Sequence, residues 1–207
     1  MKHALVTGAS GGIVKAISLK LAECGYGLYL HYNQNEEEII SLTKQIQNVP
    51  TYPIQADLAD KHAVSAILSH IHHDIDVIVH NSAAAYVGLI TDMDDQEVYD
   101  MVQLQITSPL LLTKYLLPSM IRKKAGDIIV ITSVWGFMGA SCEVLYSMVK
   151  GGLNTFVKAL AKEVAPSGIR VNGIAPGIID TKMDSHLTEE EREALRQEIP
   201  MGRFGKP

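Results

Sequence analysis

Six short apolar runs alternate along this chain with longer segments that have the periodicity of amphipathic helices. The runs cover residues 3–7, 27–32, 51–55, 75–80, 127–132 and 169–174, and the helical segments cover 12–24, 36–48, 61–72, 95–123, 144–164 and 188–198. A short apolar run is typical of a strand buried on both faces, and strands joined through helices pair in parallel. The alternation therefore predicts an α/β fold with one doubly wound, Rossmann-type parallel sheet and helices on both faces.

The length and composition of the chain favour a single domain over residues 1–207. With 207 residues and a hydrophobic content of 47%, the chain can bury a substantial core. No internal repeat, low-complexity tract or Pro/Gly-rich linker divides it. Residues 204–207 have a turn-like sequence, which predicts a lead into a further element rather than a natural terminus.

The charge distribution argues against nucleic acid as a partner. The formal net charge is -5 at pH 7, and the basic residues are scattered or lie beside acidic ones rather than forming a patch for phosphates. The N-terminus runs directly into a strand pattern without the features of a secretory signal, and no apolar run approaches the ~20 residues that cross a bilayer. We therefore expect a cytoplasmic protein that does not insert into a membrane.

The cysteines and histidines do not have the spacing of a metal site. Cys24 and Cys142 lie far apart in the sequence and are expected to be reduced thiols. His70, His72 and His73 end a predicted helix, where cationic or polar groups suit the helix dipole, and no matching carboxylate pair accompanies them. We therefore expect no metal.

A glycine-rich turn connects the first predicted strand to the first predicted helix. Residues 7–13 read Thr-Gly-Ala-Ser-Gly-Gly-Ile, and the candidate ligand residues are Gly8, Ser10, Gly12 and Ile13. Glycines in such a turn let the backbone approach a pyrophosphate, whose charge is met by the free N–H groups and positive dipole end of the helix. Glycines also serve as helix caps without a ligand, so the turn favours a dinucleotide site without establishing one.

The end of the second predicted strand bears on which dinucleotide would bind. An enzyme that selects NAD places Asp or Glu there to accept hydrogen bonds from the ribose 2'-hydroxyl. Residues 30–33 read Leu-His-Tyr-Asn and contain no acid that would repel a 2'-phosphate. Asn33 can hydrogen-bond that phosphate, so we expect NADPH rather than NADH. The alternative is that Asn33 is a polar loop residue without a ligand role.

Tyr146 and Lys150 are four residues apart in the predicted helix 144–164 and therefore project from one face. An ammonium group beside a phenol favours the phenolate, so we expect Lys150 to lower the pKa of Tyr146 from about 10 and let it pass a proton to a developing alkoxide. Ser133, at the end of the fifth predicted strand, can donate a hydrogen bond to the same oxygen. A Tyr and a Lys at this spacing also occur by chance on solvated helix faces.

The order and spacing of these motifs resemble the short-chain dehydrogenase/reductase family over the whole chain. The matching residues are Thr7-Gly8 to Gly12-Ile13, Asp57-Leu58, Asn81, Ser133, Tyr146 to Lys150 and Pro176-Gly177 to Thr181. The resemblance implies a carbonyl reductase whose catalytic residues include Ser133, Tyr146 and Lys150. It also implies a dinucleotide site. Asp57 and Leu58 would lie at the adenine, Asn81 beside the central strand, and Ile179 and Thr181 at the nicotinamide carboxamide and phosphate. The other residues implied along the cofactor are Tyr146, Lys150, Pro176 and Gly177.

Departures from the family pattern affect the expected site. The third glycine of the turn is Val14, whose branched side chain would weaken cofactor binding by separating helix and strand. The family's Asn-Asn-Ala-Gly is replaced at residues 80–83 by His-Asn-Ser-Ala, a milder change. The catalytic Asn of the family corresponds to Gln105, which would either hold or misplace the proton-relay water near Lys150. Val14 and Gln105 leave open a rival function, a catalytically inactive dinucleotide-binding sensor.

Within the family, the sequence is similar to two groups of carbonyl reductases. It is more similar to the elongation factor P 5-aminopentanone reductases, through residues 89–92, 101–104, 135–136 and 139–148. That resemblance implies reduction of a ketone carried on a modified lysine of the factor to a 5-aminopentanol. The alternative is a 3-oxoacyl-acyl-carrier-protein reductase, whose substrate is a thioester on an acyl carrier protein.

Trp135, Cys142 and Glu143 are the candidate substrate residues. Glu143 lies three residues before Tyr146 on the same predicted helix face, where its carboxylate can pair with a substrate ammonium near the reacting carbonyl. A fatty acyl chain has no such charge. The alternative is a solvated carboxylate that the helix dipole favours in a first turn.

The long predicted helices 95–123 and 144–164 resemble those through which this family forms dimers and tetramers. We therefore expect a homo-oligomer, either a dimer or a homotetramer. In either assembly, symmetry would bury the same helix faces on each copy.

Overall fold

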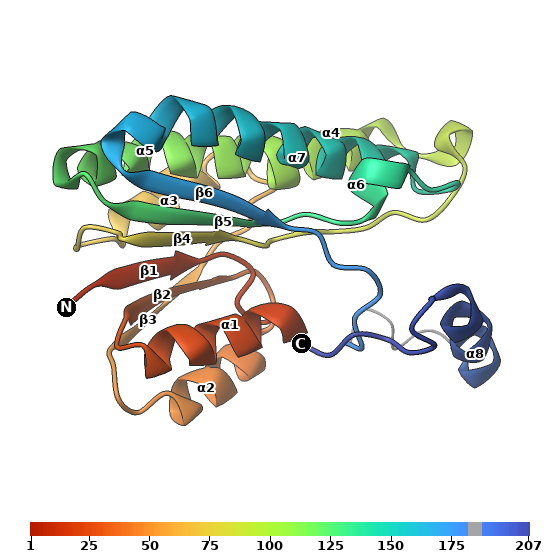
Figure 1. Cartoon of the computed structure of the whole chain (residues 1–207), viewed down its shortest axis with the longest axis horizontal. Coiled ribbons are helices and arrows are strands. Elements are labelled where there is room, and N and C mark those ends of the chain that lie inside the picture. The colour runs from red at the N-terminus through yellow and green to blue at the C-terminus, as the bar shows by residue number, and fades with distance from the viewer. Residues whose placement is uncertain (182–187) are drawn as a thin grey trace.

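The computed structural model describes residues 1–181 and 188–207, and these residues form a six-stranded, fully parallel sheet (Figure 1). Its strands stand in the order β3-β2-β1-β4-β5-β6. Their bounds are β1 His3–Val6, β2 Gly27–Tyr32, β3 Thr51–Gln55, β4 Val77–His80, β5 Gly126–Ile131 and β6 Ile169–Ile174. The doubly wound α/β sheet predicted from the sequence is therefore confirmed.

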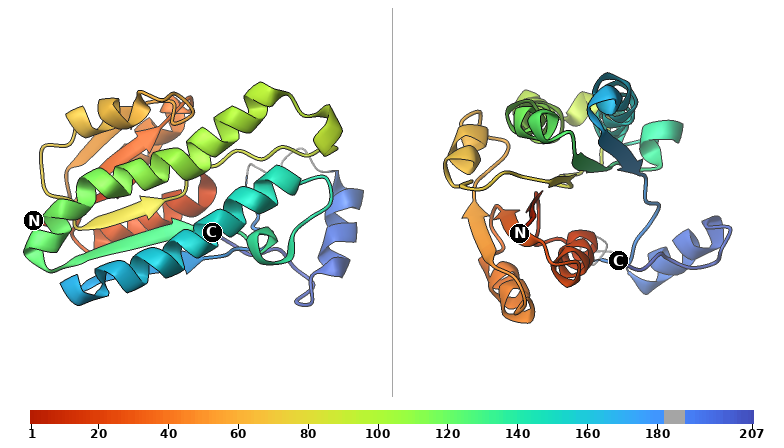
Figure 2. Two further views of the ribbon diagram at one scale, coloured as in Figure 1. Left: turned by 90° about the horizontal axis from the view of Figure 1, so that it is seen from above. Right: turned by 60° about the vertical axis from the view of Figure 1, so that its left-hand side comes forward.

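Helices cover both faces of this sheet, as Figures 1 and 2 show. One face carries α1 (Gly12–Glu23) and α2 (Glu36–Gln45), and the other carries α3 (Ala63–Ser69), α4 (Asp95–Val102), α5 (Ser108–Lys123) and α7 (Val144–Val164). The remaining helical elements of the described residues are η1 (Ile90–Asp92), η2 (Gln103–Thr107), α6 (Trp135–Met138), η3 (Ala165–Ser167) and α8 (Glu189–Glu198). Across the described ranges, no helix combines the length and the apolar character needed to cross a membrane.

Each face of the sheet forms its own hydrophobic core because the strands are apolar on both sides. Every residue of β1 and β2 is buried. Leu28 and Leu30 of β2 belong to the core that contains Val14 of α1, whereas Tyr29 belongs to the core that contains Leu112 of α5. Successive side chains of β2 therefore enter opposite cores, as expected for a parallel sheet covered on both faces.

The single long helix predicted for residues 95–123 is interrupted. α4 ends at Val102, a π-helical turn called η2 covers Gln103–Thr107, and α5 begins at Ser108. A π turn inserts one residue into an otherwise helical path, so the apolar periodicity on its two sides reads as one helix. The helical segment predicted for residues 95–123 is therefore confirmed at both ends, and the π turn within it was not predicted.

Several predicted bounds shift by a few residues. The strand predicted for 75–80 begins at Val77, the helix predicted for 36–48 ends at Gln45, and the helix predicted for 61–72 covers Ala63–Ser69. Helix and strand ends depend on local hydrogen bonds that periodicity does not detect. The short helix α6 was not predicted, because a single turn leaves no periodic pattern in the sequence.

The strand order reverses between β1 and β4, and open parallel sheets bind ligands at the carboxyl end of such a switch point. The turn before α1, the short helix α6 and the final helix α8 all lie toward this end of the sheet (Figure 1). The C-terminus also lies here, beside the first residue of α1, because Pro207 is 3.7 Å from the position of a Cβ built on Gly12 (Figure 1). The candidate functional site is therefore expected at this edge.

Candidate active site

The glycine-rich turn between β1 and α1 has the geometry of a phosphate-binding loop. Gly8 has a φ of +67°, which favours glycine, and a Cβ there would lie 3.0 Å from the Cα of Ser82. Gly12 opens α1, and a Cβ on it would lie 2.9 Å from Cγ2 of Thr181. The first turn of α1 contains no acidic residue, so its free N–H groups present only the positive end of the helix dipole. These residues fit the pyrophosphate of a dinucleotide.

Thr7 and Asn81 hold this turn against the end of β4. The hydroxyl of Thr7 accepts a hydrogen bond from the backbone N–H of Asn81 at 3.0 Å. The side-chain nitrogen of Asn81 lies 3.2 Å from the Cβ position of Gly8. Asn81 therefore lies where the family resemblance implies a supporting role. Ser10 and Ile13, also expected at the cofactor, are half-buried in the same turn.

Val14, the departure from the third family glycine, does not prevent α1 from packing on the sheet. Its side chain is fully buried in the core formed with Val6 and Leu30. The branched side chain is thus accommodated between helix and sheet. Its predicted effect on cofactor affinity stays a prediction.

A buried histidine that the sequence analysis did not select lies behind the turn. His31 of β2 is 2% exposed, its Nδ1 is 3.2 Å from the backbone nitrogen of Gly8, and its Nε2 is 3.0 Å from the carbonyl oxygen of Ala56. Burial lowers the pKa of His31 to about 4, against the raising effects of the bond to Ala56 and the charge of Asp57. The available signal in the sequence was a polar residue inside an otherwise apolar strand.

The residues expected at the adenosine end occupy the carboxyl ends of β2 and β3. Asp57 is exposed, and its carboxylate accepts the backbone N–H of Ala59 at 3.0 Å. Leu58 is buried in the core, and its carbonyl accepts the hydroxyl of Ser108 at 2.7 Å. Asn33 is exposed just after β2, where no acid stands. Their contacts with an adenosine stay predictions.

Ser133, Tyr146 and Lys150 come together at the carboxyl end of β5. Ser133 is buried just after that strand, and Tyr146 and Lys150 lie one turn apart on α7. The Nζ of Lys150 is 5.4 Å from the centroid of the Tyr146 ring and donates to the carbonyl of Ile131 at 3.2 Å. Ser133 acts on the hydroxyl of Tyr146, since its side chain lowers the pKa of that group. The structure therefore gathers the three residues whose catalytic roles the sequence predicts.

Burial sets the protonation of the Tyr146–Lys150 pair. Burial lowers the pKa of the Lys150 ammonium to about 8. It also raises the pKa of Tyr146, while the hydrogen bond with Ser133 lowers that pKa and the charge of Glu143 raises it. The expectation that Lys150 lowers the pKa of Tyr146 is therefore wrong for this arrangement, because desolvation of the phenolate dominates. Tyr146 keeps its proton at neutral pH, which is the state a proton donor needs.

The short helix α6 packs tightly onto α7 beside Lys150. A Cβ on Gly136 would lie 2.7 Å from the carbonyl carbon of Lys150 and 2.8 Å from the side-chain nitrogen of Asn154. A Cβ on Gly151 would in turn lie 3.2 Å from the carbonyl oxygen of Gly136. The close approach of the two backbones therefore requires glycine at 136.

Gln105 lies in the π turn η2 and is fully buried. Its Nε2 donates to the carbonyl of Ala84 at 2.7 Å, which ties the loop after β4 to the helix. Its Oε1 has no hydrogen-bond partner among residues 1–181 and 188–207. A π turn is a frequent feature of functional sites. The expected role of Gln105 in holding a relay water near Lys150 stays a prediction.

Trp135, Cys142 and Glu143 lie between the start of α6 and the start of α7. Glu143 is half-buried; burial raises the pKa of its carboxyl group, and a hydrogen bond with the side chain of Trp135 lowers it. Cys142 has a φ of +62°, which is uncommon outside glycine, and its carbonyl accepts the N–H of Gly88 at 2.9 Å. Because the charge of Glu143 raises the pKa of Tyr146, this carboxylate is within electrostatic reach of the reacting hydroxyl.

The segment after β6 leads from the catalytic strands to the glycine-rich turn. The backbone N–H of Val134 donates to the carbonyl of Pro176 at 3.1 Å, and Gly177 is exposed. Ile179 forms a parallel bridge with the C-terminal segment, and Thr181 packs against the first residue of α1. The contacts of these four residues with a bound dinucleotide stay predictions.

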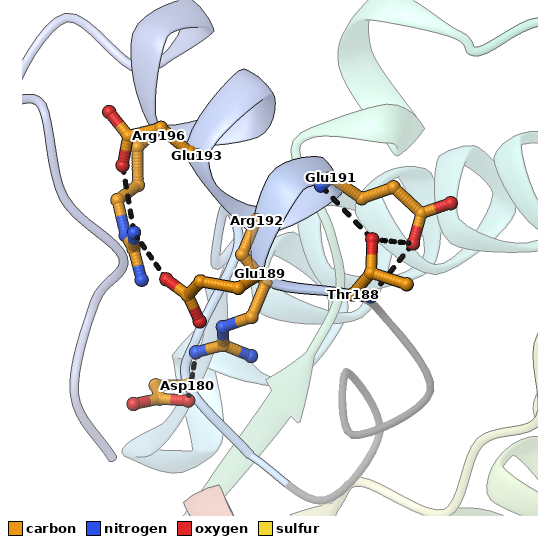
Figure 3. Close-up of polar contacts among 7 residues, drawn as sticks. All are labelled: Asp180, Thr188, Glu189, Glu191, Arg192, Glu193 and Arg196. Atoms are coloured by element: carbon orange, nitrogen blue, oxygen red, sulfur yellow. Dashed lines mark hydrogen bonds and ion pairs between the residues drawn. The ribbon is translucent and has the colours of Figure 1, made fainter.

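Helix α8 is attached to this segment by an ion pair (Figure 3). Arg192 donates to the carboxylate of Asp180 at 2.8 Å. Thr188 caps the helix by accepting the backbone N–H of Glu191, whose carboxylate accepts the backbone N–H of Thr188 in return. The capped helix and its ion pair fix the position of residues 188–198 relative to the segment after β6.

The histidines near residue 70 do not form a metal centre with other ligands. Within the part of the chain that the structure describes, no group of three or more His, Cys, Asp or Glu side chains could hold a metal ion. His73 instead stacks on His3 with ring centroids 4.1 Å apart and forms a 2.6 Å hydrogen bond with the hydroxyl of Tyr29. His3 opens β1, so this cluster lies at the amino end of the sheet, opposite the candidate site.

Comparison with known proteins agrees with this fold. A family model described as short chain dehydrogenase matches residues 2–192. The uncharacterized oxidoreductase YmfI of Bacillus subtilis (strain 168) is 51% identical over 209 residues, covering 100% of this chain and 86% of that protein. The 3-oxoacyl-acyl-carrier-protein reductase FabG of Pseudomonas aeruginosa is 37% identical over 209 residues, covering 99% and 85%. A crystal structure of 3-oxoacyl-acyl-carrier-protein reductase from Brucella melitensis ATCC 23457 is similar with a TM-score of 0.90 and 26% identity, covering 100% and 80%. The chain therefore belongs to the short-chain dehydrogenase family and is an oxidoreductase.

Proposed function

We propose that this chain is an NADPH-dependent reductase of a ketone that carries an amine, and specifically of the 5-aminopentanone group on a lysine of elongation factor P. The observation that carries the proposal is the half-buried carboxylate of Glu143, which lies at the start of the helix that bears Tyr146 and acts electrostatically on that hydroxyl. A translation factor is a cytoplasmic substrate, so the proposal includes a cytoplasmic location.

The residues at the end of β5 can perform the proton-transfer half of a carbonyl reduction. A reduced nicotinamide dinucleotide would supply the hydride to the carbonyl carbon. Ser133 donates a hydrogen bond to the carbonyl oxygen, and Tyr146, protonated because burial raises its pKa, gives its proton to the oxygen as negative charge develops. Lys150, mostly charged at pH 7 because its pKa is about 8, stabilises the phenolate that this transfer leaves behind.

The preference for NADPH rests on the end of β2. Asn33 is exposed there, and residues 30–33 include no acid at the position that would face a 2'-phosphate; the nearest carboxylates in the chain are those of Glu36–Glu38 at the start of α2. We expect kcat/KM to be higher with NADPH than with NADH for the same ketone. Equal values with both coenzymes would contradict the preference and leave the reductase activity intact.

Recognition of an amine follows from the environment of Glu143. Burial disfavours the ionised carboxylate and raises its pKa. A cation that takes the place of the lost water would therefore stabilise the ionised form. A substrate ammonium would provide that cation, and a charge-assisted hydrogen bond would form beside the reacting carbonyl. A fatty acyl thioester has no positive charge to offer this carboxylate.

Turnover by the purified protein on two carriers tests the substrate. We expect NADPH oxidation with elongation factor P that carries the ketone, and little with an acetoacetyl acyl carrier protein. Glu143→Gln should lower kcat/KM for an amine-bearing ketone by about 10- to 100-fold, because a hydrogen bond to a charged group is lost, while the same ketone without the amine is unaffected. Glu163→Gln, at an exposed carboxylate on α7, is the matched control. Equal losses on both ketones would refute the role of Glu143.

The second candidate substrate is a 3-oxoacyl thioester on an acyl carrier protein. Relatives such as FabG of Pseudomonas aeruginosa, 37% identical, favour it because they are reductases of that substrate by name. If the substrate is this thioester, the protein should reduce the acetoacetyl carrier rapidly, and Glu143→Gln should leave that rate unchanged. A catalytically inactive sensor would bind NADPH and oxidise none of it with either carrier.

We also propose that the chain assembles into a homo-oligomer through α5 and α7. An apolar groove between these helices is lined by Ile106, Leu110, Gly152, Leu153 and Phe156, among others. Half of the Leu110 side chain is exposed, which is costly for a residue of this kind in water. A dimer or tetramer in light scattering, shifted toward monomer by Leu110→Glu, is the expected result. A monomeric wild-type protein would contradict it.

A further inference from the structure

Segments from four strands of the sheet meet at the imidazole ring of His31. Nδ1 lies 3.2 Å from the backbone nitrogen of Gly8 in the turn after β1, and Nε2 lies 3.0 Å from the carbonyl oxygen of Ala56 at the end of β3. The hydroxyl of Ser82, after β4, lies 3.5 Å from Nδ1. The carbonyl of His31 itself accepts the N–H of Ala9 at 2.8 Å. One buried residue of β2 thus contacts both Gly8 and Ala9 at the start of the glycine-rich turn.

The hydrogen-bond partners of His31 determine its tautomer. A carbonyl oxygen only accepts, so Nε2 must carry the proton that is donated to Ala56. A backbone N–H only donates, so Nδ1 must be unprotonated to accept from Gly8. Burial lowers the pKa of His31 to about 4, although Asp57 and the bond to Ala56 raise it, so the ring is neutral at pH 7. The neutral Nε2–H tautomer satisfies both partners at once.

We propose that His31 is a positioning residue of the dinucleotide site, which holds the N–H of Gly8 and thereby fixes the glycine-rich turn in the conformation that receives the pyrophosphate. The turn lies tightly against the segment after β4, because a Cβ on Gly8, which has a φ of +67°, would lie only 3.0 Å from the Cα of Ser82. Asn81 approaches the same glycine from β4. The inference rests on the dinucleotide site of the proposed function, and the identity of the ketone does not enter it.

Substitutions that keep one of the two hydrogen bonds separate this positioning role from simple core packing. In His31→Asn, the side-chain oxygen takes the place of Nδ1 and can still accept from Gly8. In His31→Gln, the amide nitrogen takes the place of Nε2 and can still donate to Ala56. His31→Leu keeps neither bond. The chemistry of the lost bond, rather than the size of the side chain, thus distinguishes the variants.

Fluorescence titration with NADPH, in the absence of any ketone, measures the effect on cofactor affinity. We expect the dissociation constant of His31→Asn to stay near that of the wild-type protein. We expect it to rise about tenfold or more in His31→Gln and His31→Leu, because the buried N–H of Gly8 loses its acceptor. A rise of the same size in the Asn and Gln variants would overturn the assignment.

His80→Leu provides a matched control for the loss of a buried imidazole. His80 is also 2% exposed with a pKa lowered to about 4 by burial, but its Nε2 is hydrogen-bonded to the hydroxyl of Thr113 on α5 at 2.8 Å. We expect His80→Leu and His31→Leu to lower the melting temperature similarly. Only His31→Leu should weaken NADPH binding. If His80→Leu weakened NADPH binding equally, His31 would contribute only to the stability of the core and the positioning role would be refuted.

Hydrogen exchange at the Gly8 amide gives a readout that needs neither cofactor nor ketone. Exchange should be faster in His31→Gln and His31→Leu than in the wild-type protein and His31→Asn, because the N–H loses its acceptor. Unchanged exchange in all variants would overturn the proposal. If the wild-type protein failed to bind NADPH, the cofactor assignment would be refuted, and the exchange comparison would still decide whether His31 holds the turn.

Discussion

Replacement of Lys150 by Met should make the folded protein more stable while it removes catalysis. The pKa of Lys150 falls from its ordinary value of 10.5 to about 8 because the side chain is 2% exposed. At pH 7 this shift corresponds to about 3 kcal/mol of destabilisation, since the ammonium must lose water on folding. Lys150→Met removes this destabilisation, but it also removes the hydrogen bond to the carbonyl of Ile131, which costs about 1–2 kcal/mol. The net expected gain in the free energy of unfolding is about 1–2 kcal/mol.

The pH dependence of this difference identifies its cause. Between about pH 8 and 10.5, the unfolded chain binds a proton at Lys150 that the folded protein has released, so the stability of the wild-type protein rises with pH there relative to Lys150→Met. The electrostatic part of the advantage should shrink from about 3 kcal/mol at pH 7 to about 1 kcal/mol at about pH 9.5. The variant should therefore lose its net advantage at alkaline pH.

Urea unfolding of the two proteins at both pH values is the assay, with NADPH oxidation measured in parallel. Lys162→Met is the matched control, because Lys162 lies on the same helix and is exposed. We expect Lys162→Met to change neither stability nor its pH dependence. If Lys150→Met were less stable than the wild-type protein at pH 7, or if its advantage did not change with pH, the assignment of the shift to burial would be refuted.

Three further outcomes follow from the structure. The kcat/KM for a ketone should fall above about pH 8 as Lys150 loses its proton, and a profile that stays flat to about pH 10 would contradict the need for its charge. His31 and His80 have pKa values of about 4, so the folded protein resists their protonation. The free energy of unfolding should therefore fall by up to about 3 kcal/mol for each histidine as the pH drops from 6.5 toward 4. In urea unfolding, His80→Leu should lose less stability over this pH range than the wild-type protein does. Gly136→Ala should lower turnover by about tenfold or more, because its Cβ would push α6 away from the backbone of Lys150. Gly173→Ala is the control and should have little effect, because a Cβ there would lie 3.6 Å or more from its neighbours. Similar turnover in both variants would argue against the tight contact between α6 and α7.

The sequence predicted the centre of the sheet because β1, β2 and β4 are buried on both faces and therefore read as short apolar runs. β2, for example, was predicted with its observed bounds of Gly27–Tyr32, and α7 with its bounds of Val144–Val164. The helical segment 95–123 was also predicted with its observed ends, but the π turn at Gln103–Thr107 was missed because it changes the helical path by one residue and leaves the apolar pattern on both sides intact.

The candidate site was predictable where spacing alone fixes geometry. Tyr146 and Lys150 had to share a helix face once that helix existed. The direction of the pKa shift of Tyr146 was not predictable, because it depends on how much water the surrounding segments remove. The bonds of His31 to Gly8 and Ala56 were also beyond the sequence, since they join segments that only the strand order brings together.

Transfer of a proton from Tyr146 is tested most directly by NADPH oxidation in the presence of a ketone, with wild-type protein and Tyr146→Phe compared at matched cofactor occupancy. The phenyl ring keeps the packing beside Lys150 and lacks only the hydroxyl group. At matched cofactor occupancy we expect turnover by the variant to fall by about 10²- to 10⁴-fold, the range for loss of a general acid. Turnover by Tyr146→Phe at a rate close to that of the wild-type protein would contradict the assignment of this residue as the proton donor.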